Sequence, residues 1–281
     1  MAWLLACGAL WAADLVEVRT AEGERKQVLG KILEETYSSI KMELQDGANL
    51  IQRDIPIEKD GRQLVITVRR GELPPQYSLA YQKFRNRLYG EAFQDLSKPE
   101  VALEVQANPW LEPYVRFFAG ESALREAKYA QSAEEGKRQW YAQAEEQYGK
   151  LSDDGRLSKH RFAPEAMLGR ALALMRLDRF QEAADVLASV AASDCPPWFK
   201  AEAEVWQGRL LVEQGRYDEA IARLGELMGR FSSSPPPEVF RLYGDDERRP
   251  DPSYLAMLAE AYAYQGKKEF PKAEDLFEAV G

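Results

Sequence analysis

Few side chains in this sequence could do chemistry, and their arrangement does not favour catalysis. The single histidine, His160, stands in the polar run SDDGRLSKHRF and is predicted to be a solvated loop residue. Acid pairs such as Glu145-Glu146 would diverge by about 100° on a helix, so they are expected to form solvated surface. The sequence contains no phosphate-cradling glycine loop, zinc-ligand spacing or nucleophile elbow. It therefore predicts a non-enzymatic protein without cofactor or metal.

The two cysteines bear on export more than on reactivity. The opening residues MAWLLACGALWAADL are apolar but too few to span a bilayer, which takes roughly 20. Residues 1–13 are interpreted as a secretory signal, truncated if its basic leader has been lost, and this predicts a periplasmic or cell-envelope protein. A buried first element in a cytoplasmic protein is the alternative. The run around Cys7 also resembles a bacterial lipoprotein processing box, so membrane attachment is expected only through a lipid on Cys7. Cys195, beside two prolines, is predicted to be a packed residue.

Length and charge limit the remaining classes. A chain of 281 residues is long enough for two units or one extended repeat array. Its 45% hydrophobic and 30% charged residues are typical of a folded, soluble protein. The formal net charge of −9 disfavours nucleic acid as the main partner, because phosphate binding depends on clustered lysine and arginine.

Residues 14–73 are predicted to form a small antiparallel β barrel or sheet. Ile40, Met42 and Leu44 alternate with charged residues, and Leu64, Ile66 and Val68 form a second set, which indicates strands with one buried face. Expected strands cover 14–20, 27–34, 36–44, 48–52 and 63–69. The stretch resembles the small Sm-like and SH3-like barrels found ahead of helical repeats, some of which bind nucleic acid. Ten basic residues stand against twelve acids between 14 and 72, so a protein-docking or structural module is favoured.

Residues 74–281 repeat one pattern of helix-forming sequence. An alanine is preceded three residues earlier by an aromatic residue and followed four residues later by a large apolar one. The alanines are Ala92, Ala144, Ala183, Ala220 and Ala273. The aromatic residues are Tyr89, Tyr141, Phe180, Tyr217 and Phe270, and the large apolar residues are Leu96, Tyr148, Leu187, Leu224 and Phe277. Two antiparallel helices in close contact explain this, because a small residue lets their axes approach.

The pattern resembles the tetratricopeptide repeat, a helix-turn-helix unit of about 34 residues that stacks into a superhelix. The best copies are 164–196 and 201–235; the second contains Gly208, Gly215, Tyr217, Ala220 and Leu224. The resemblance implies a mainly α fold, an α-solenoid of about five repeats behind the β module. Twelve residues before three of the alanines stand Ala80, Ala171 and Gly208, so small residues are expected to face one another.

The sequence also departs from the standard repeat. The spacings of 52 and 53 residues at either end of the alanine series indicate extra material. The second unit is expected to take its first helix from residue 110. Two residues are inferred to be inserted between Gly266 and Ala273, with Pro271 at a helix start. The last pair is expected to leave an apolar edge, explained by a longer chain or by contact with another protein.

The resemblance implies a partner site on the first helices of successive repeats, which line a concave groove in this family. Mapped onto the two best copies, the groove residues are Leu168, Leu172, Met175, Arg176, Val205, Arg209, Val212 and Glu213. Their aliphatic members would provide burial for an amphipathic segment and their arginines would select acidic groups. The alternative is that the aliphatic residues are repeat core and the charged ones are solvated. Residues 232–252, rich in proline, are a second candidate.

These observations predict a scaffold or adaptor that binds a protein segment or peptide in its groove. The alternatives are a nucleic-acid-binding accessory protein that uses the β module and an outer-membrane assembly lipoprotein. The oligomeric state is left open by the sequence.

Overall fold

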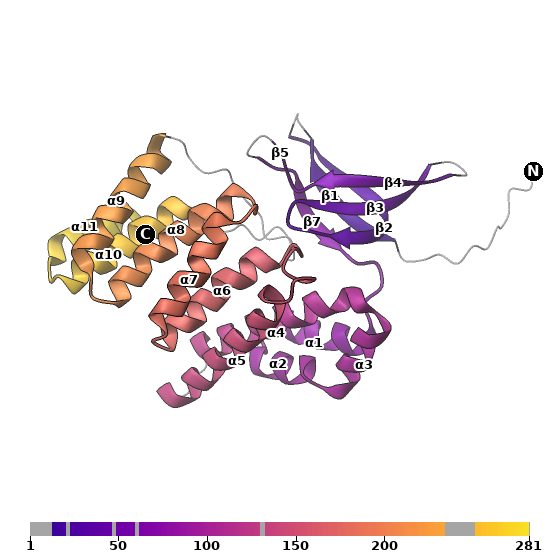
Figure 1. The fold of residues 1–281 in the computed structure, drawn as a ribbon, viewed down its shortest axis with the longest axis horizontal. Coiled ribbons are helices and arrows are strands. Elements are labelled where there is room, and N and C mark those ends of the chain that lie inside the picture. Colours follow the sequence, from indigo (N-terminus) through magenta and orange to yellow (C-terminus); the bar gives the residue numbers. More distant parts are fainter. Residues whose placement is uncertain are drawn as a thin grey trace, which may run out of the picture. The chain divides into compact units, whose positions relative to one another are not determined.

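The computed structural model describes residues 13–20, 23–46, 49–59, 62–129, 133–233 and 251–280. They form two compact units, one on each side of the step from Pro74 to Pro75. The first unit is built from strands and the second from helices (Figure 1). The signal segment and Cys7 fall in residues 1–12, which lie outside the described part of the chain, as do residues 234–250.

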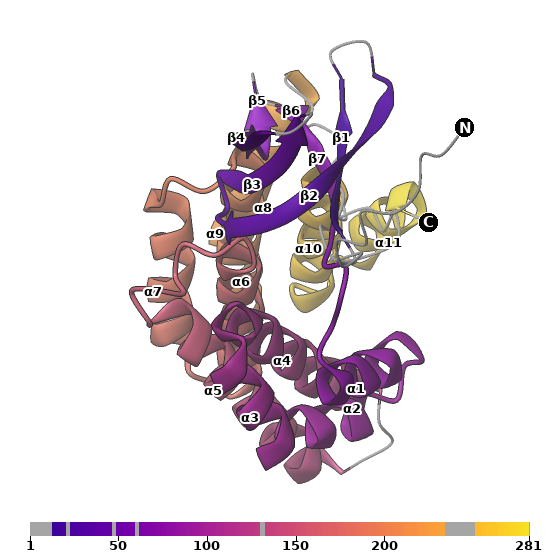
Figure 2. The same ribbon diagram turned by 90° about the vertical axis from the view of Figure 1, so that its right-hand side faces the viewer.

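The first unit is an antiparallel sheet with the strand order β4-β3-β2-β1-β7. Strand β2 pairs with β1 through its first half and with β3 through its second, and it curves between the two (Figure 2). The strands are β1 Asp14–Arg19, β2 Arg25–Glu35, β3 Ser39–Asp46, β4 Asn49–Pro56 and β7 Val65–Arg69, with the short pair β5 Glu58–Lys59 and β6 Arg62–Gln63. The predicted antiparallel β unit is therefore confirmed, in the form of a sheet.

A bulge in β7 overturns one part of the predicted pattern. The register of β7 against β1 shifts, and Ile66 is the extra residue between the paired positions Val65 and Thr67. All four residues from Val65 to Val68 are buried, and since Thr67 and Val68 beyond the bulge face opposite sides, β7 is covered on both faces. The one-sided alternation predicted for Leu64, Ile66 and Val68 is wrong for this reason.

A buried ion-pair cluster joins the beginning, middle and end of this unit. The Arg70 guanidinium donates through Nε to Glu35 Oε1 at 2.9 Å and through Nη1 to Asp14 Oδ2 at 3.2 Å. The side chains of Arg70 and Glu35 are only 8% and 1% exposed. Loss of Arg70 would leave the Glu35 carboxylate buried without this counter-ion, which is strongly destabilising. Arg70 therefore stabilises the sheet and is not exposed for binding to the phosphates of a nucleic acid.

The second unit contains, within the described residues, five helix pairs that follow one another from α1–α2 to α10–α11 (Figure 1). The pairs are α1 Pro75–Arg85 with α2 Tyr89–Leu96, α4 Glu112–Tyr129 with α5 Glu134–Ser152, α6 Ala163–Arg176 with α7 Phe180–Ala192, α8 Pro197–Glu213 with α9 Tyr217–Ser233, and α10 Pro252–Gly266 with α11 Phe270–Val280. Helix α4 is the first helix predicted from residue 110. Helix α3 Pro99–Ala107 and the 3-10 turn η1 Pro109–Leu111 are the extra material of the first long spacing.

The five alanines of the repeat pattern lie where the sequence places them. Each is buried, with at most 3% of its surface exposed, and each is in the second helix of its pair. The large apolar residues four positions later are buried in the first four pairs, and Phe277 is half-buried. Both results confirm the predicted helix-pair packing and the mainly α fold.

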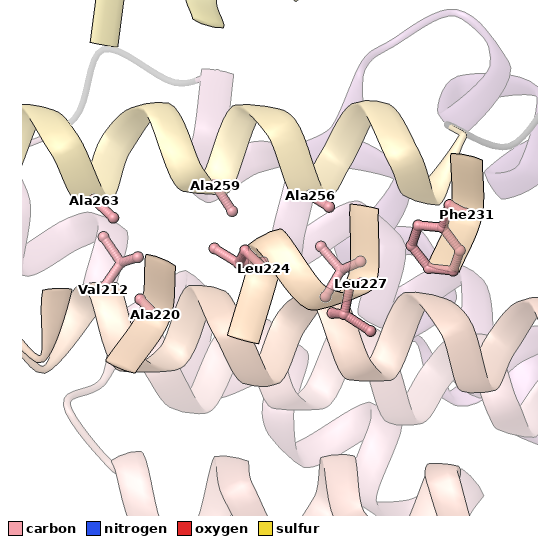
Figure 3. Packing of buried hydrophobic residues seen from close by; sticks show 9 residues of the cluster. Val212, Ala220, Leu224, Leu227, Phe231, Ala256, Ala259 and Ala263 are labelled. Carbon is pink, nitrogen blue, oxygen red and sulfur yellow. The ribbon is translucent and has the colours of Figure 1, made fainter. Parts of the chain in front are cut away.

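Close packing around Leu224 and Tyr148 refines the expected contacts. A Cβ added to Gly208 would lie 2.5 Å from Leu224 Cδ2, so this glycine faces a large side chain and the predicted small-to-small contact is wrong here. The Tyr148 ring lies between Gly120 and Gly169 in the same way. Figure 3 shows the corresponding core of the last helices, where alanines of α10 face α9. Its members are Val205, Val212, Ala220, Leu224, Leu227, Phe231, Ala256, Ala259 and Ala263.

The turns inside the pairs share one conformation. The residue two positions before the aromatic residue has a positive φ at four described turns, namely Arg87, Asp178, Gly215 and Lys268. At each turn the backbone N–H of this residue donates to the carbonyl three residues earlier, and the N–H of the next residue donates to the carbonyl five residues before itself. In one example, Gly215 N–H donates to Val212 O at 3.0 Å and Arg216 N–H donates to Leu211 O at 2.9 Å. These are Schellman caps. Lys268 and Gly215 both precede their alanine by five residues, so the insertion predicted after Gly266 is wrong.

Candidate functional site

The structure divides the eight predicted groove residues into two groups. Helix α8 lies against both α6 and α10, so these first helices are neighbours. Leu168, Met175, Val205 and Val212 are buried, and both valines belong to the core formed with α9 and α10. These four residues hold the repeats together, which is the alternative that the sequence left open. The other four are Leu172, Arg176, Arg209 and Glu213, and they are half-buried or exposed.

The three charged residues of the second group interact directly. Arg209 donates through Nε to Glu213 Oε1 at 3.0 Å, one turn along α8. Arg176, on α6, donates to the same oxygen from Nη1 at 3.5 Å. Two guanidinium groups thus converge on one carboxylate, and the Arg176 side chain is 42% exposed. The two arginines and the one glutamate together carry one net positive charge at the surface.

Helix α10 adds aromatic side chains that the sequence argument missed. The Arg209 guanidinium lies over the ring of Tyr262, with 4.2 Å from Cζ to the ring centroid. Tyr262 is 37% exposed and Tyr254, two turns earlier, is 44% exposed. The signal for Tyr262 was present: it stands eleven residues before Ala273, as Arg209 does before Ala220 and Leu172 before Ala183.

We call Leu172, Arg176, Arg209, Glu213 and Tyr262 the first-helix face. It combines an aliphatic side chain, an aromatic ring and two guanidinium groups that share one carboxylate, on three successive first helices. Arginine recognises carboxylates through charge-assisted hydrogen bonds, and a tyrosine ring offers apolar area at low entropic cost. The arrangement suits recognition of an acidic group that stands beside apolar side chains.

The residues whose reactivity the sequence raised all pack against or pair with other side chains in the structure. His160 is half-buried, with its ring centroid 5.0 Å from that of Phe162, so the prediction of a solvated loop residue is wrong. Burial raises the pKa of the Cys195 thiol, whose Sγ donates to Val190 O at 3.6 Å, and this confirms a packed cysteine. Glu145 pairs with Arg170 at 3.1 Å, and its side chain is 16% exposed. The expectation that it forms solvated surface is therefore wrong.

The described residues offer neither a metal centre nor a membrane-spanning helix. Among them, no group of three or more histidine, cysteine, aspartate or glutamate side chains is placed to hold a metal ion. None of the described helices combines the length and apolar character that crossing a membrane requires. The second candidate segment, residues 232–252, falls largely outside the described part of the chain.

One comparison with known proteins agrees with the helix-pair geometry. A family model described as tetratricopeptide repeat matches residues 202–234, the α8–α9 pair. A search of curated proteins found no match. Among solved structures, a point variant of a putative kinesin light chain with TPR-like repeats from Podosopora anserina is 17% identical, with 73% of this chain and 91% of that chain covered and a TM-score of 0.47.

A second solved structure, BtubC (BKLC) from P. vanneervenii, is 14% identical over 73% of this chain and 88% of that chain, with a TM-score of 0.35. The family match covers the α8–α9 pair, and the burial of the five alanines extends the same packing to the other four pairs. Together they identify the helical unit as a tetratricopeptide-like repeat array, which follows a small antiparallel sheet.

Proposed function

We propose that this chain is a non-enzymatic scaffold that binds an acidic, partly apolar segment of another protein on the first-helix face. The observation that carries the proposal is the pair of arginines, Arg176 and Arg209, that share the single carboxylate of Glu213. A carboxylate from a partner would complete the charge balance, and the Tyr262 ring would cover apolar side chains next to it. Repeat arrays of this kind generally serve as interaction scaffolds, which supports the same proposal.

The proposal can be tested with a library of displayed linear peptides selected on the full chain. We expect the enriched peptides to combine aspartate or glutamate with aromatic or aliphatic residues. The double variant Arg176→Glu, Arg209→Glu should lose at least about 90% of binding to an enriched peptide, because it replaces attraction with repulsion. Arg223→Glu, on the exposed side of α9, is the matched control and should leave binding unchanged.

Salt provides an independent measurement on the same peptides. Binding that depends on the two arginines should weaken between about 50 mM and 500 mM NaCl, because exposed charges are screened. Enrichment of basic peptides, or equal binding by the double variant and the control, would refute the proposed partner chemistry.

We also propose export to the cell envelope, on the basis of the apolar opening segment alone. Mass spectrometry of the mature N-terminus tests this proposal. A start at Ala13 or Asp14 supports cleavage, whereas a diacylated Cys7 would instead support the lipoprotein alternative. An intact residue 1 in the purified native protein would refute both.

A further inference from the structure

Helix α10 carries a buried glutamate, Glu260, that lies outside the first-helix face. The residue is 7% exposed, and its Oε2 atom has no hydrogen-bond partner in the described structure. Burial raises the pKa of this carboxyl group, and no charged neighbour contributes to the shift. Because a buried carboxylate without a counter-ion is costly, this place favours a cation that can reach it.

Glu260 corresponds by register to Arg170 of α6. Each of the two residues precedes the repeat alanine of its pair by thirteen positions. Ala256 and Ala263, one turn before and one turn after Glu260, face α9 (Figure 3). Glu260 is therefore directed at the second helix of the preceding pair, as Arg170 is directed at α5.

The α5–α6 junction shows what this place holds when it is filled by a guanidinium group. A Cβ added to Gly149 of α5 would lie 3.4 Å from the Arg170 Cζ atom, so the guanidinium packs on a glycine. Arg170 bonds there to Glu145 at 3.1 Å and to Asp153 at 2.7 Å. The site thus consists of a glycine surface with carboxylates beside it.

Helix α9 repeats the glycine surface. Gly225 and Gly229 follow their repeat alanine by five and nine positions, as Gly149 and Asp153 do in α5. A Cβ added to Gly225 or to Gly229 would meet no atom within 4 Å in the described structure, and Gly229 is exposed. The α9–α10 junction therefore keeps the space that a guanidinium group takes at α5–α6, and its carboxylate comes from the other helix.

Basic side chains of the helices next to α10 pair with other acids. Arg230 of α9 pairs with Glu204 of α8, and Lys272 of α11 pairs with Glu269 at 2.8 Å. Neither contributes to the electrostatic surroundings of Glu260. The complementary charge must therefore come from another molecule.

We propose that the α9–α10 site, formed by Gly225, Gly229 and Glu260, binds the guanidinium group of an arginine side chain of another protein. The group would lie on the glycines as Arg170 lies on Gly149, and a change of the Glu260 rotamer would bring the carboxylate to it. Arginine suits the site better than lysine, because its planar group packs on a flat surface and donates two hydrogen bonds to one carboxylate.

A capped tripeptide with one arginine between two glycines is a direct probe, and the same peptide with citrulline is its neutral match. The full-length chain would carry carbon-13 at its glutamate carboxyl groups, and loss of a signal in Glu260→Gln would assign that of Glu260. In the free protein this signal should titrate above the ordinary pKa of 4.5. Saturating arginine peptide should lower the midpoint by at least about one pH unit, because a bound cation favours the ionised carboxyl group. The citrulline peptide should leave the midpoint unchanged.

Variants of α9 locate the binding site. Gly225→Leu should weaken binding of the arginine peptide at pH 7 by about tenfold or more, because the new side chain fills the space beside Glu260. Leucine favours a helix more than glycine does, so circular dichroism should show unchanged folding. Glu226→Gln removes an exposed acid from the same helix and is the matched control, which should leave binding unchanged.

This test is independent of the proposal for the first-helix face. A single side chain should bind in the millimolar range, which is too weak for enrichment from a displayed library. The double variant Arg176→Glu, Arg209→Glu should leave the response of the Glu260 signal unchanged. Failure of either proposal is therefore distinguishable from failure of the other.

Three outcomes would overturn the proposal. The first is a Glu260 titration that is the same with the arginine peptide as with the citrulline peptide. The second is an equal effect of Gly225→Leu and Glu226→Gln on binding. The third is binding of N-butylguanidinium about tenfold tighter than that of the arginine peptide, since the ligand would then be a small molecule and not a protein side chain.

Discussion

Helices α5 and α9 have corresponding places in the array, but their junctions with the next pair are built differently. At the α5–α6 junction, the Tyr148 ring fills a slot between two glycines, and its hydroxyl donates to Glu121 Oε1 at 2.7 Å. At the α9–α10 junction, Leu224 packs against Gly208 and the alanines of α10 (Figure 3). Both solutions pair a large side chain with small residues, so the apolar design is common to the two.

The polar residues at the same junctions are not equivalent. Arg170 of α6 pairs with Glu145 of α5, whereas the corresponding residues of α10 and α9 are Glu260 and Ile221. Glu260 is 7% exposed, and its Oε2 atom has no hydrogen-bond partner in the described structure. Burial raises the pKa of this carboxyl group. Repeats therefore preserve the apolar contacts that set helix spacing, while each junction accommodates its polar residues separately.

The largest effect is expected from removing the ring at the α5–α6 junction. Tyr148→Ala should lower the free energy of unfolding by about 3–5 kcal/mol, because it empties a slot lined by backbone that cannot collapse fully. Tyr148→Phe keeps the ring and should cost only about 1 kcal/mol for the lost hydroxyl. Urea unfolding followed by circular dichroism measures both. Similar losses for the two variants would mean that the hydrogen bond, and not the glycine slot, is the main contribution.

Overpacking the α8–α9 pair tests the other junction. Ala220 is fully buried, and Ala220→Trp should cost about 1–3 kcal/mol or more, because the helices must separate to admit the ring. Ala222→Trp places the same ring on the exposed side of α9 and serves as the control. Equal melting temperatures for the two variants would contradict the alignment of the repeats on their alanines.

The repeat pattern was sufficient to predict the helix pairs and the burial of their alanines, but not which side chains meet at the junctions or how the polar residues are paired. Five alanines in one register indicate helix pairs because only a small residue permits close axes. Sequence periodicity cannot show which neighbouring helix covers a side chain, so Val205 and Val212 were assigned to a groove although they lie in the core. Arg87, Asp178 and Lys268 adopt the positive-φ conformation that glycine usually occupies, so the turns at these positions lack the glycine that would indicate them in the sequence. Tyr262 was missed because only the two strongest repeats were mapped.

The buried carboxyl group of Glu260, whose Oε2 atom has no hydrogen-bond partner in the described structure, should make the α9–α10 junction sensitive to pH. The pKa of Glu260 is raised in the folded state above its ordinary value of 4.5. The contribution of this group to the free energy of unfolding therefore falls as the pH rises from 4.5 to the raised pKa, and it does not change further above that pKa. Glu260→Gln removes the charge and should raise the free energy of unfolding at pH 7 by about 1–2 kcal/mol. Its advantage should shrink below about pH 4.5, where the wild-type carboxyl is protonated in both states.

Urea titrations of both proteins at several pH values measure this difference. An advantage of Glu260→Gln that is constant between about pH 4 and pH 8 would exclude charge burial as its cause. A loss of stability at pH 7 would mean that the carboxylate is stabilised by a group in the folded protein. The matched position of α8, Gln207, already carries the amide, which indicates that the repeat tolerates it.

The smallest effects concern the caps shared by four described turns inside the helix pairs. Gly215→Ala should cost about 1 kcal/mol, because an L-residue at its φ of 74° is strained although the space around it is open. Lys268→Gly should stabilise the last pair by about 0.5–1 kcal/mol, because it relieves the same strain at a φ of 63°. Gly229→Ala, within α9 and also in open space, should stabilise by a similar amount through helix propensity. Opposite signs for Gly215→Ala and Gly229→Ala in thermal unfolding would show that backbone conformation, and not loss of glycine, determines the result.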